Sequence, residues 1–237
     1  MKQYLMLKLL ISSLLLLSSA SLIAQNDSIV NDSIVYKQKY GLRLGGDLNK
    51  LIRSFVDDEY KGFEINADYR ITKNLYIAGE LGTEEKITET DFLNTKSSGS
   101  YFKAGADINV YENWFGMENM IYAGLRVGLA SFKQELNSYT IYNTDQYWEP
   151  YTTSNSKEFE GLSAVWAELI VGLKAEVLNN VFIGINAQLK SLISDDKPDN
   201  FNNNHIPGFN KTYDSKSIGV GFGYNISYLI PLYKKDK

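Results

Sequence analysis

The sequence predicts an all-β fold, a single closed antiparallel up-and-down transmembrane β-barrel of about eight strands after a cleaved signal peptide. Three observations predict it. The first 24 residues have the composition of an export signal. Eight later segments alternate apolar and polar residues with period two, and helical spacing is not sustained in any segment. Short and long connections alternate along the chain.

The chain begins with a predicted secretory signal peptide at residues 1–24. Lys2 and Lys8 are followed by an apolar run, and small residues lead to Ala24, after which we expect cleavage. An N-terminal membrane anchor is disfavoured because the uninterrupted apolar run is too short to span a bilayer. Residues 25–38, which contain the tandem repeat NDSIVNDSIV, are expected to form a flexible periplasmic segment.

Composition excludes several classes of function. The formal charge is −4, and loss of Lys2 and Lys8 with the signal peptide gives −4 − 2 = −6 for the mature protein. This acidic balance argues against a nucleic-acid partner, because binding to nucleic acid needs a basic surface. The absence of Cys excludes disulfides and lipid attachment to a cysteine. No later segment approaches ~18 consecutive apolar residues, so no transmembrane helix is expected.

We expect the barrel at residues 39–233, before a C-terminal tail at 234–237. In the first strand Leu42 and Leu44 lie on one face, and Arg43 lies on the other. In chain order the eight alternating segments cover residues 40–48, 62–71, 75–82, 101–110, 121–129, 165–177, 181–190 and 218–232.

Turn residues separate the later segments. The second segment, GFEINADYRI, places polar side chains at every second position, and a TKN turn leads into the third, LYIAGELG. The fourth, YFKAGADINV, and the fifth, IYAGLRVGL, are joined by the stretch YENWFGMEN. The sixth, VWAELIVGLKAEV, turns at NN into the seventh, VFIGINAQLK. The eighth, IGVGFGYNISYLIPL, is apolar on one face and begins with three glycines on the other.

Three strands begin alike, with NLYIAG, MIYAG and NVFIG. Each places an aromatic residue on the polar face at its second position, namely Tyr76, Tyr122 and Phe182. These strands start at the same end of the sheet, so a repeated hairpin unit is indicated. Because side chains nearly fill an eight-stranded barrel, these rings are expected to constrict one end and to prevent substantial diffusion.

The composition of the polar face indicates whether the apolar face points outward to lipid or into the barrel. The polar face is rich in glycine, which weakens a strand facing water but relieves crowding inside a narrow barrel. It also carries charges of both signs, which can pair across a lumen. We therefore expect an apolar face towards lipid and a lumen polar network. The network comprises Arg43, Glu64, Asp68, Arg70, Glu80, Lys103, Asp107, Arg126, Glu168, Lys174 and Lys190. The alternative is a secreted soluble β-barrel that turns its apolar face inward to bind an apolar ligand.

Loop lengths favour the membrane barrel. Long connections at 49–61, 83–100, 133–161 and 194–217 alternate with short turns, which is the pattern of outer-membrane proteins with long loops outside the cell. We therefore predict location in the cell outer membrane, with outer-membrane lipid as a partner. Aromatic residues are expected at the two interfaces: Tyr40, Phe63, Tyr69, Trp114, Phe115, Tyr228 and Tyr233.

Two further features favour this location. Gly223, Ile226, Tyr228 and Tyr233 look similar to the C-terminal signal read by the outer-membrane assembly machinery, a partner expected during biogenesis, although the KKDK tail is a departure. The segments YGLRLGGDLNKLIRSFVDDEYKGFEINADYRI, YENWFGMENMIYAGLR, NSYTIYNTDQYW and IPGFNKTYDS together resemble an uncharacterised small outer-membrane β-barrel family of Gram-negative bacteria, a domain of unknown function. The resemblance implies the barrel and its location, and no activity.

Candidate chemistry is sparse, and we predict no catalytic residue, no cofactor and no metal site. His205 is the one His, so an outer-membrane lipid-modifying enzyme would have to use it; a loop His among Asn and Asp is expected to be exposed and inert. The same loop offers oxygen ligands suited to Ca²⁺, but their spacing does not match an EF-hand loop, and a polar flexible loop is favoured. These ligands are Asp195, Asp196, Asp199, Asn202, Asn203 and Asn204.

The loop at 133–161 is the candidate for recognition. It carries Tyr139, Tyr142, Tyr147, Trp148 and Tyr151 among Asn and Thr. Such rings provide contact area at low entropic cost and suit an extracellular glycan or protein ligand. The favoured interpretation is that the flanking strands extend past the membrane and pair these rings across strands. The sequence thus predicts a non-enzymatic outer-membrane protein with a structural or recognition role through its extracellular loops.

Overall fold

The computed structural model describes residues 37–111, 118–141, 147, 151–154, 156–198, 202–211 and 217–236. The predicted signal peptide, nearly all of the predicted periplasmic segment, and Trp114 and Phe115 lie outside the described residues.

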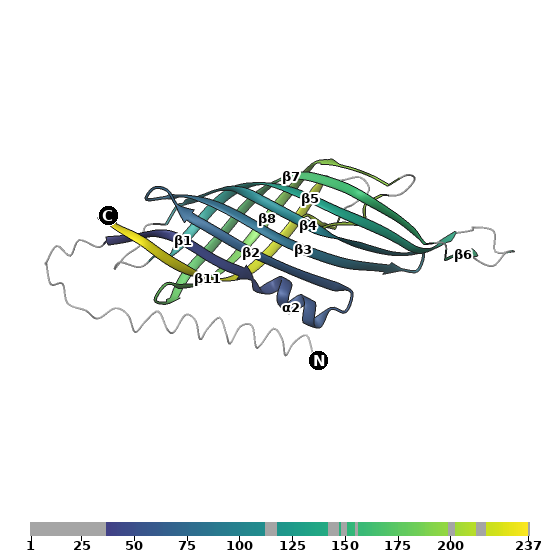
Figure 1. Cartoon of the computed structure of the whole chain (residues 1–237), viewed down its shortest axis with the longest axis horizontal. Helices are drawn as coiled ribbons and strands as arrows, with labels where there is room; N and C mark the ends of the chain where they lie inside the picture. Colours follow the sequence, from purple (N-terminus) through teal and green to yellow (C-terminus); the bar gives the residue numbers. More distant parts are fainter. Residues whose placement is uncertain are drawn as a thin grey trace. The chain divides into compact units, whose positions relative to one another are not determined.

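Eight antiparallel strands close into a barrel, as predicted (Figure 1). Its strands are β1 (Lys37–Asp47), β2 (Tyr60–Arg70), β3 (Leu75–Thr90), β4 (Leu93–Asn109), β5 (Met120–Ile141), β7 (Lys157–Leu178), β8 (Val181–Asp195) and β11 (Ile218–Asp236). Each pairs with its neighbours along the chain, and β1 pairs with β11 to close the ring. The short β6 (Tyr151–Thr153) adds to the end of β5, and β9 (His205–Ile206) pairs with β10 (Asn210–Lys211) in a separate hairpin.

Two of the predicted long loops are largely strand. β3 and β4 stay paired from Leu75↔Ile108 to Thr90↔Leu93, and β5 and β7 stay paired as far as Leu136↔Lys157. The sequence alternation fades there because the outward residues become hydroxyl-bearing or charged instead of apolar. Backbone pairing does not need apolar side chains, so the ladders continue where the apolar pattern stops.

The seam between β1 and β11 contains a register shift at Tyr40/Gly41. Tyr40 was predicted at an exposed interface level, but its side chain is buried, stacked on Tyr233 with ring centroids 5.3 Å apart. The extra residue of this bulge is Leu232 of β11, between the paired residues Pro231 and Tyr233, so the regular alternation of inward and outward side chains is interrupted at this point of the seam. The seam also runs beyond the predicted barrel bounds, from Lys37↔Asp236.

A helix occupies the predicted loop at 49–61. Helix α2 (Leu48–Val56) begins after Asp47, whose side chain accepts a hydrogen bond from Lys50 N at 3.1 Å. An acidic N-cap of this kind stabilises the first turn. Within the part of the chain described, no helix has both the length and the apolar character needed to cross a membrane.

The apolar face of the barrel points outward. Val220 is 73% exposed, Leu169 45% and Ile185 44%, whereas the alternating charged residues are buried inside. The soluble barrel with an apolar interior is therefore wrong. Exposed apolar residues occur on every strand of the ring and include Leu44, Phe63, Ile65, Ile77, Leu81, Phe102, Ile108, Leu125, Val127, Leu169, Val171, Ile183, Ile185, Val220, Phe222 and Ile226. These residues are called the apolar belt below.

Glycine on the inner face makes room for large side chains. Trp166 is fully buried, and a Cβ at Gly128 on the neighbouring strand would overlap its ring. The interior near the outer mouth therefore depends on a small residue beside a large one, as the glycine-rich polar face predicted.

We expect Gly128→Leu to lower the free energy of unfolding by about 3 kcal/mol, because the new side chain must displace the Trp166 ring. Urea unfolding in detergent, followed by tryptophan fluorescence, measures this. Gly79→Leu is the control, since Gly79 lies on the outward face and its nearest atom, the Lys103 carbonyl oxygen, is 3.6 Å from a Cβ at that position. Equal stability of the two variants would contradict the assignment of faces.

Candidate functional site

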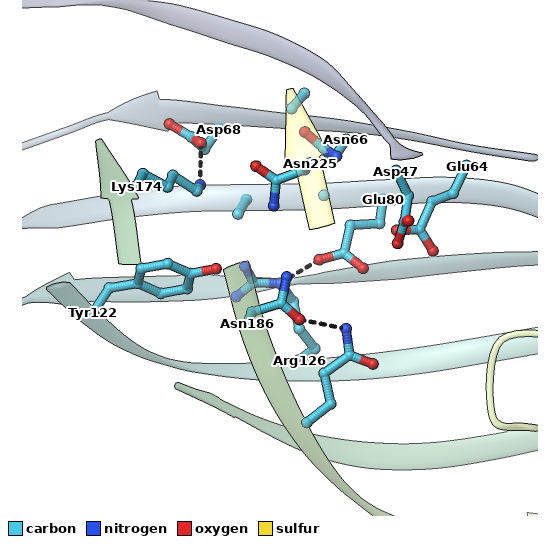
Figure 2. Close-up of a pocket in the computed structure, with 14 residues that line it drawn as sticks. Asp47, Glu64, Asn66, Asp68, Glu80, Tyr122, Arg126, Lys174, Asn186 and Asn225 are labelled. Carbon is cyan, nitrogen blue, oxygen red and sulfur yellow. Dashed lines mark hydrogen bonds and ion pairs between the residues drawn. The ribbon is translucent and has the colours of Figure 1, made fainter. Parts of the chain in front are cut away.

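Charged side chains from seven strands of the ring meet inside the barrel. Figure 2 shows part of this group. Asp68 of β2 is held between two cations, with Lys174 Nζ at 2.6 Å and Arg43 Nε at 3.4 Å. All three side chains are buried. Removal of charges from water is costly, and opposite charges at these distances offset that cost.

A second group of charges lies towards the outer mouth. Lys103 is almost completely buried and contacts Glu80, with Glu64 at 3.3 Å and Glu168 at 3.9 Å. Lys190 lies 3.9 Å from the same Glu168. One buried cation therefore lies beside three carboxylates, and loss of Lys103 would leave each of them with one other cation, at 3.6, 3.7 and 3.9 Å.

Arg126 and Asp107 form the pair with the best geometry. Two guanidinium nitrogens lie 2.8 and 3.0 Å from the two carboxylate oxygens, and Glu80 lies 3.6 Å from Arg126 Nε. A two-point contact of this kind fixes the orientation of both side chains. Towards the opposite end, Arg70 pairs with Glu118 at 2.9 Å. The structure thus places all eleven residues of the predicted lumen polar network inside the barrel, in ion pairs with one another or, for Arg70, with Glu118.

Around Arg126 and Lys174 the interior has almost no free space. A cavity of about 30 Å³ lies among the charged residues, room for about two water molecules. The predicted constricting rings, Tyr76, Tyr122 and Phe182, are all buried inside the barrel. Arg43 stacks over Phe182 at 4.4 Å, and Lys174 lies 5.0 Å above the ring of Tyr122.

The β9–β10 hairpin closes the outer mouth. Ile206 and Phe209 are buried in an apolar cluster with Trp166 and Tyr101. Lys190 Nζ donates to Gly208 O at 2.7 Å, and Ser97 Oγ donates to His205 O at 2.7 Å. We call residues 205–211 the plug hairpin.

Glu84 is the anchor of the plug hairpin. Its buried carboxylate accepts a hydrogen bond from Gly208 N at 3.0 Å, lies 3.1 Å from His205 Nε2, and forms an ion pair with Lys50 of α2. Burial alone would lower the pKa of Lys50, but Glu84 and Glu64 raise it above its usual value, so Lys50 is charged. One carboxylate therefore joins the wall, the helix and the plug hairpin.

His205 is not the exposed loop residue that the sequence predicted. It is 6% exposed, and its ring faces Glu84 rather than a serine hydroxyl. The prediction was based on the polar composition of the loop. It did not consider Ile206 and Phe209, whose burial places this segment inside the barrel.

The candidate calcium ligands are engaged in hydrogen bonds within the protein. Asp195 accepts from Asn203 Nδ2 at 2.9 Å, and Asp196 accepts from Ser163 Oγ at 2.6 Å. Asn204 donates to Thr95 at 3.1 Å, and Asp199 lies outside the described residues. Among the residues described, no three His, Asp or Glu side chains are grouped to hold a metal ion.

The aromatic loop is partly described. Tyr139 lies at the end of β5 and pairs with Thr153 of β6, while Ile141 pairs with Tyr151. Tyr147 and Tyr151 are strongly exposed, and Tyr142 and Trp148 lie outside the described residues. The strands thus extend past the barrel wall and carry these rings outward.

Sequence reasoning missed Glu84, Lys50 and Glu118. Glu84 continues the inward phase of Tyr76 and Glu80, so a longer third strand would have revealed it. Lys50 required recognition of α2, and Glu118 lies in a connection with no repeating pattern.

The family model described as "Domain of unknown function (DUF6048)" matches residues 6–235. No curated protein matches the chain. Among solved structures, the chain is similar to the crystal structure of Ail, the attachment invasion locus protein of Yersinia pestis, with 11% identity and a TM-score of 0.38. That similarity covers 81% of this chain and 95% of Ail.

We expect Glu84→Gln to loosen the plug hairpin. It removes the charge that Lys50 needs, at a local cost of about 3 kcal/mol, so the amides of Ile206, Gly208 and Phe209 should exchange with deuterium ~100-fold faster. The control is Glu158→Gln, which removes an exposed carboxylate paired with Lys133. Unchanged exchange in Glu84→Gln would contradict the anchoring role.

Proposed function

This chain belongs to the DUF6048 family, a domain of unknown function, and we propose that it is a non-enzymatic outer-membrane protein, a β-barrel closed to diffusion. The apolar belt is the observation that carries this proposal. Apolar side chains are exposed on all eight strands of the ring, while charged side chains fill the interior. In water such a surface would be strongly unfavourable, whereas in a bilayer it is the required one.

The filled interior supports a closed barrel. The ion pair between Lys174 of β7 and Asp68 of β2 crosses the lumen, and the plug hairpin covers the mouth. Water-filled channels need wider rings than eight strands provide. His205 has no hydroxyl partner on its ring within the described hydrogen bonds, which supports the non-enzymatic assignment.

A recognition role for the outer strand extensions is the second part of the proposal. Tyr147 is 82% exposed on the connection between β5 and β6, and Tyr151 and Tyr139 are exposed nearby on the two paired strands. Rings presented in this way, among Asn and Thr, suit an extracellular glycan.

Membrane residence predicts that the folded protein runs faster on SDS gels unboiled than boiled, and that it fractionates with outer membranes. Val171→Arg, in the apolar belt on β7, should lower the free energy of unfolding in lipid vesicles by about 2–4 kcal/mol. Ser100→Arg is the control, because Ser100 faces outward beside Thr83, above the belt residues Leu81 and Phe102, where the cost is ~0–1 kcal/mol. Identical migration before and after boiling, with equal stability of both variants, would refute a membrane barrel.

If these rings bind a glycan, the purified protein should bind at least one oligosaccharide on an array of cell-surface glycans. Tyr147→Ala and Tyr151→Ala should each weaken that binding at least ~10-fold, because a well-placed aromatic ring contributes more than about 1 kcal/mol. Tyr111→Ala, at the opposite end of the barrel, should leave it unchanged. Binding by both loop variants at the wild-type level would exclude these rings as the contact.

A further inference from the structure

The barrel wall is interrupted between β2 and β11. β1 pairs with β11 as far as Asp47↔Asn225 and with β2 as far as Gly46↔Ile65, and then leaves the wall as α2. Beyond this point, among the described strands, β2 continues paired only with β3, and β11 only with β8. Residues 60–64 and 218–224 are therefore two strand edges that face a gap, which we call the lateral notch.

Helix α2 covers the lateral notch and contacts both edges through polar side chains (Figure 1). Ser54 Oγ accepts a hydrogen bond from Gly62 N at 2.7 Å on the β2 side, and Asn49 Nδ2 lies 3.5 Å from Phe222 O on the β11 side. Two side-chain contacts thus replace a β ladder. A wall closed by side chains is easier to open than a wall closed by continuous backbone pairing.

Both charged residues of α2 are paired within the protein. Lys50 forms an ion pair with Glu84 inside the barrel and lies 3.7 Å from Glu64. Arg53 Nε lies 3.1 Å from the carboxylate of Asp57, just after the helix. The polar face of α2 therefore has its partners inside the protein and leaves no free charge for a ligand.

The opposite face of α2 is apolar and exposed. Leu48, Leu51, Ile52, Phe55 and Val56 follow the i, i+3, i+4, i+7, i+8 spacing of one helical stripe, which we call the α2 stripe. None of the five is buried, and Phe55 is 87% and Val56 80% exposed. A helix on a protein surface in water has the reverse arrangement, with its apolar stripe on the protein and its polar face outward. Like the barrel, α2 is inverted.

The α2 stripe lies at the outer border of the apolar belt. The helix begins beside the level of Ile65 on β2, and Ser54 near its end contacts Gly62. Between these levels the outward residue of β2 is Phe63, a member of the belt, whereas the next outward residue, Lys61, is charged. An amphipathic helix at the height where an apolar surface gives way to a charged one lies at a lipid interface.

The apolar belt borders the α2 stripe on both sides. α2 packs on β2 and β11, whose outward side chains include Phe63 on one side and Val220 and Phe222 on the other. Apolar surface is thus continuous from β2 across α2 to β11, over the part of the wall that has no strand. Whatever covers the belt also covers the stripe, and for the belt of a membrane barrel that cover is hydrocarbon.

We propose that the α2 stripe inserts into the acyl chains of the outer leaflet, so that the membrane itself holds α2 over the lateral notch. This inference rests on the membrane location proposed above. The polar face of α2 replaces the missing strand pairing, and the stripe replaces the belt residues that a longer β1 would present to lipid. The partner of this surface is therefore the lipid surface and not a second protein.

Single fluorescent labels on the full protein test the proposal, because the chain has no Cys of its own. Phe55→Cys is labelled and folded into phosphatidylcholine vesicles, with or without bromine on the acyl chains. We expect bromine to quench this label at least about half as strongly as a label at Val171→Cys, and iodide in the water to quench it at least ~fivefold less than a label at Lys61→Cys. The two controls occupy a belt position of β7 and a charged outward position of β2.

Each variant is first checked for the gel shift on boiling, and Ile52→Cys, on the same stripe, replaces Phe55→Cys if that variant fails to fold. Iodide quenching equal to that at Lys61→Cys would overturn the proposal, because the stripe would then face water. Protection from both quenchers would also overturn it, because a second copy or another part of the protein would then cover the stripe. In both cases bromine quenching at Val171→Cys leaves the membrane barrel standing, whereas its absence would refute the membrane location itself.

Discussion

Backbone pairing is the constraint on which the whole structure depends. In hydrocarbon each unpaired N–H or C=O costs several kcal/mol, so strands can cross a bilayer only as a closed ring. Here the ring closes through β1 and β11, the first and last strands of the chain. The departure of β1 at Asp47 is the one place among the described strands of the ring where pairing stops early on both sides, and α2 covers that place with its own polar side chains.

The closed ring determines the chemistry of its interior. Outward positions in the apolar belt must be apolar, so the charged side chains of the central strand segments are directed into a space that water can scarcely enter. A charge in this space is stabilised by an opposite charge beside it, which offsets the cost of its removal from water. Shared partners such as Asp68 and Glu168 join the ion pairs into networks. Glycines such as Gly128 then supply the volume that the long side chains require.

Alternation predicted the strands, their directions and the faces of the barrel, because a period of two is a direct consequence of strand geometry. It could not predict α2, since nine residues with an outward apolar stripe resemble a short strand segment or a loop. The bulge in β11 opposite Tyr40 left no sequence signal, so the burial of the Tyr40 side chain could not be predicted from alternation. The plug hairpin was hidden because Ile206 and Phe209 are scattered in an Asn-rich segment, and only the tertiary fold brings Glu84 and Trp166 to them.

The seam at Tyr40 and Tyr233 has a kinetic consequence. These stacked rings belong to opposite ends of the chain, whereas every other pair of neighbouring strands in the ring is also adjacent in the order of synthesis. The entropy of closing so long a segment must be paid before the seam contributes any stability. Neighbouring strands therefore pair first as hairpins, and β1 and β11 pair last. A curved, open sheet is thus the species that precedes the closed barrel.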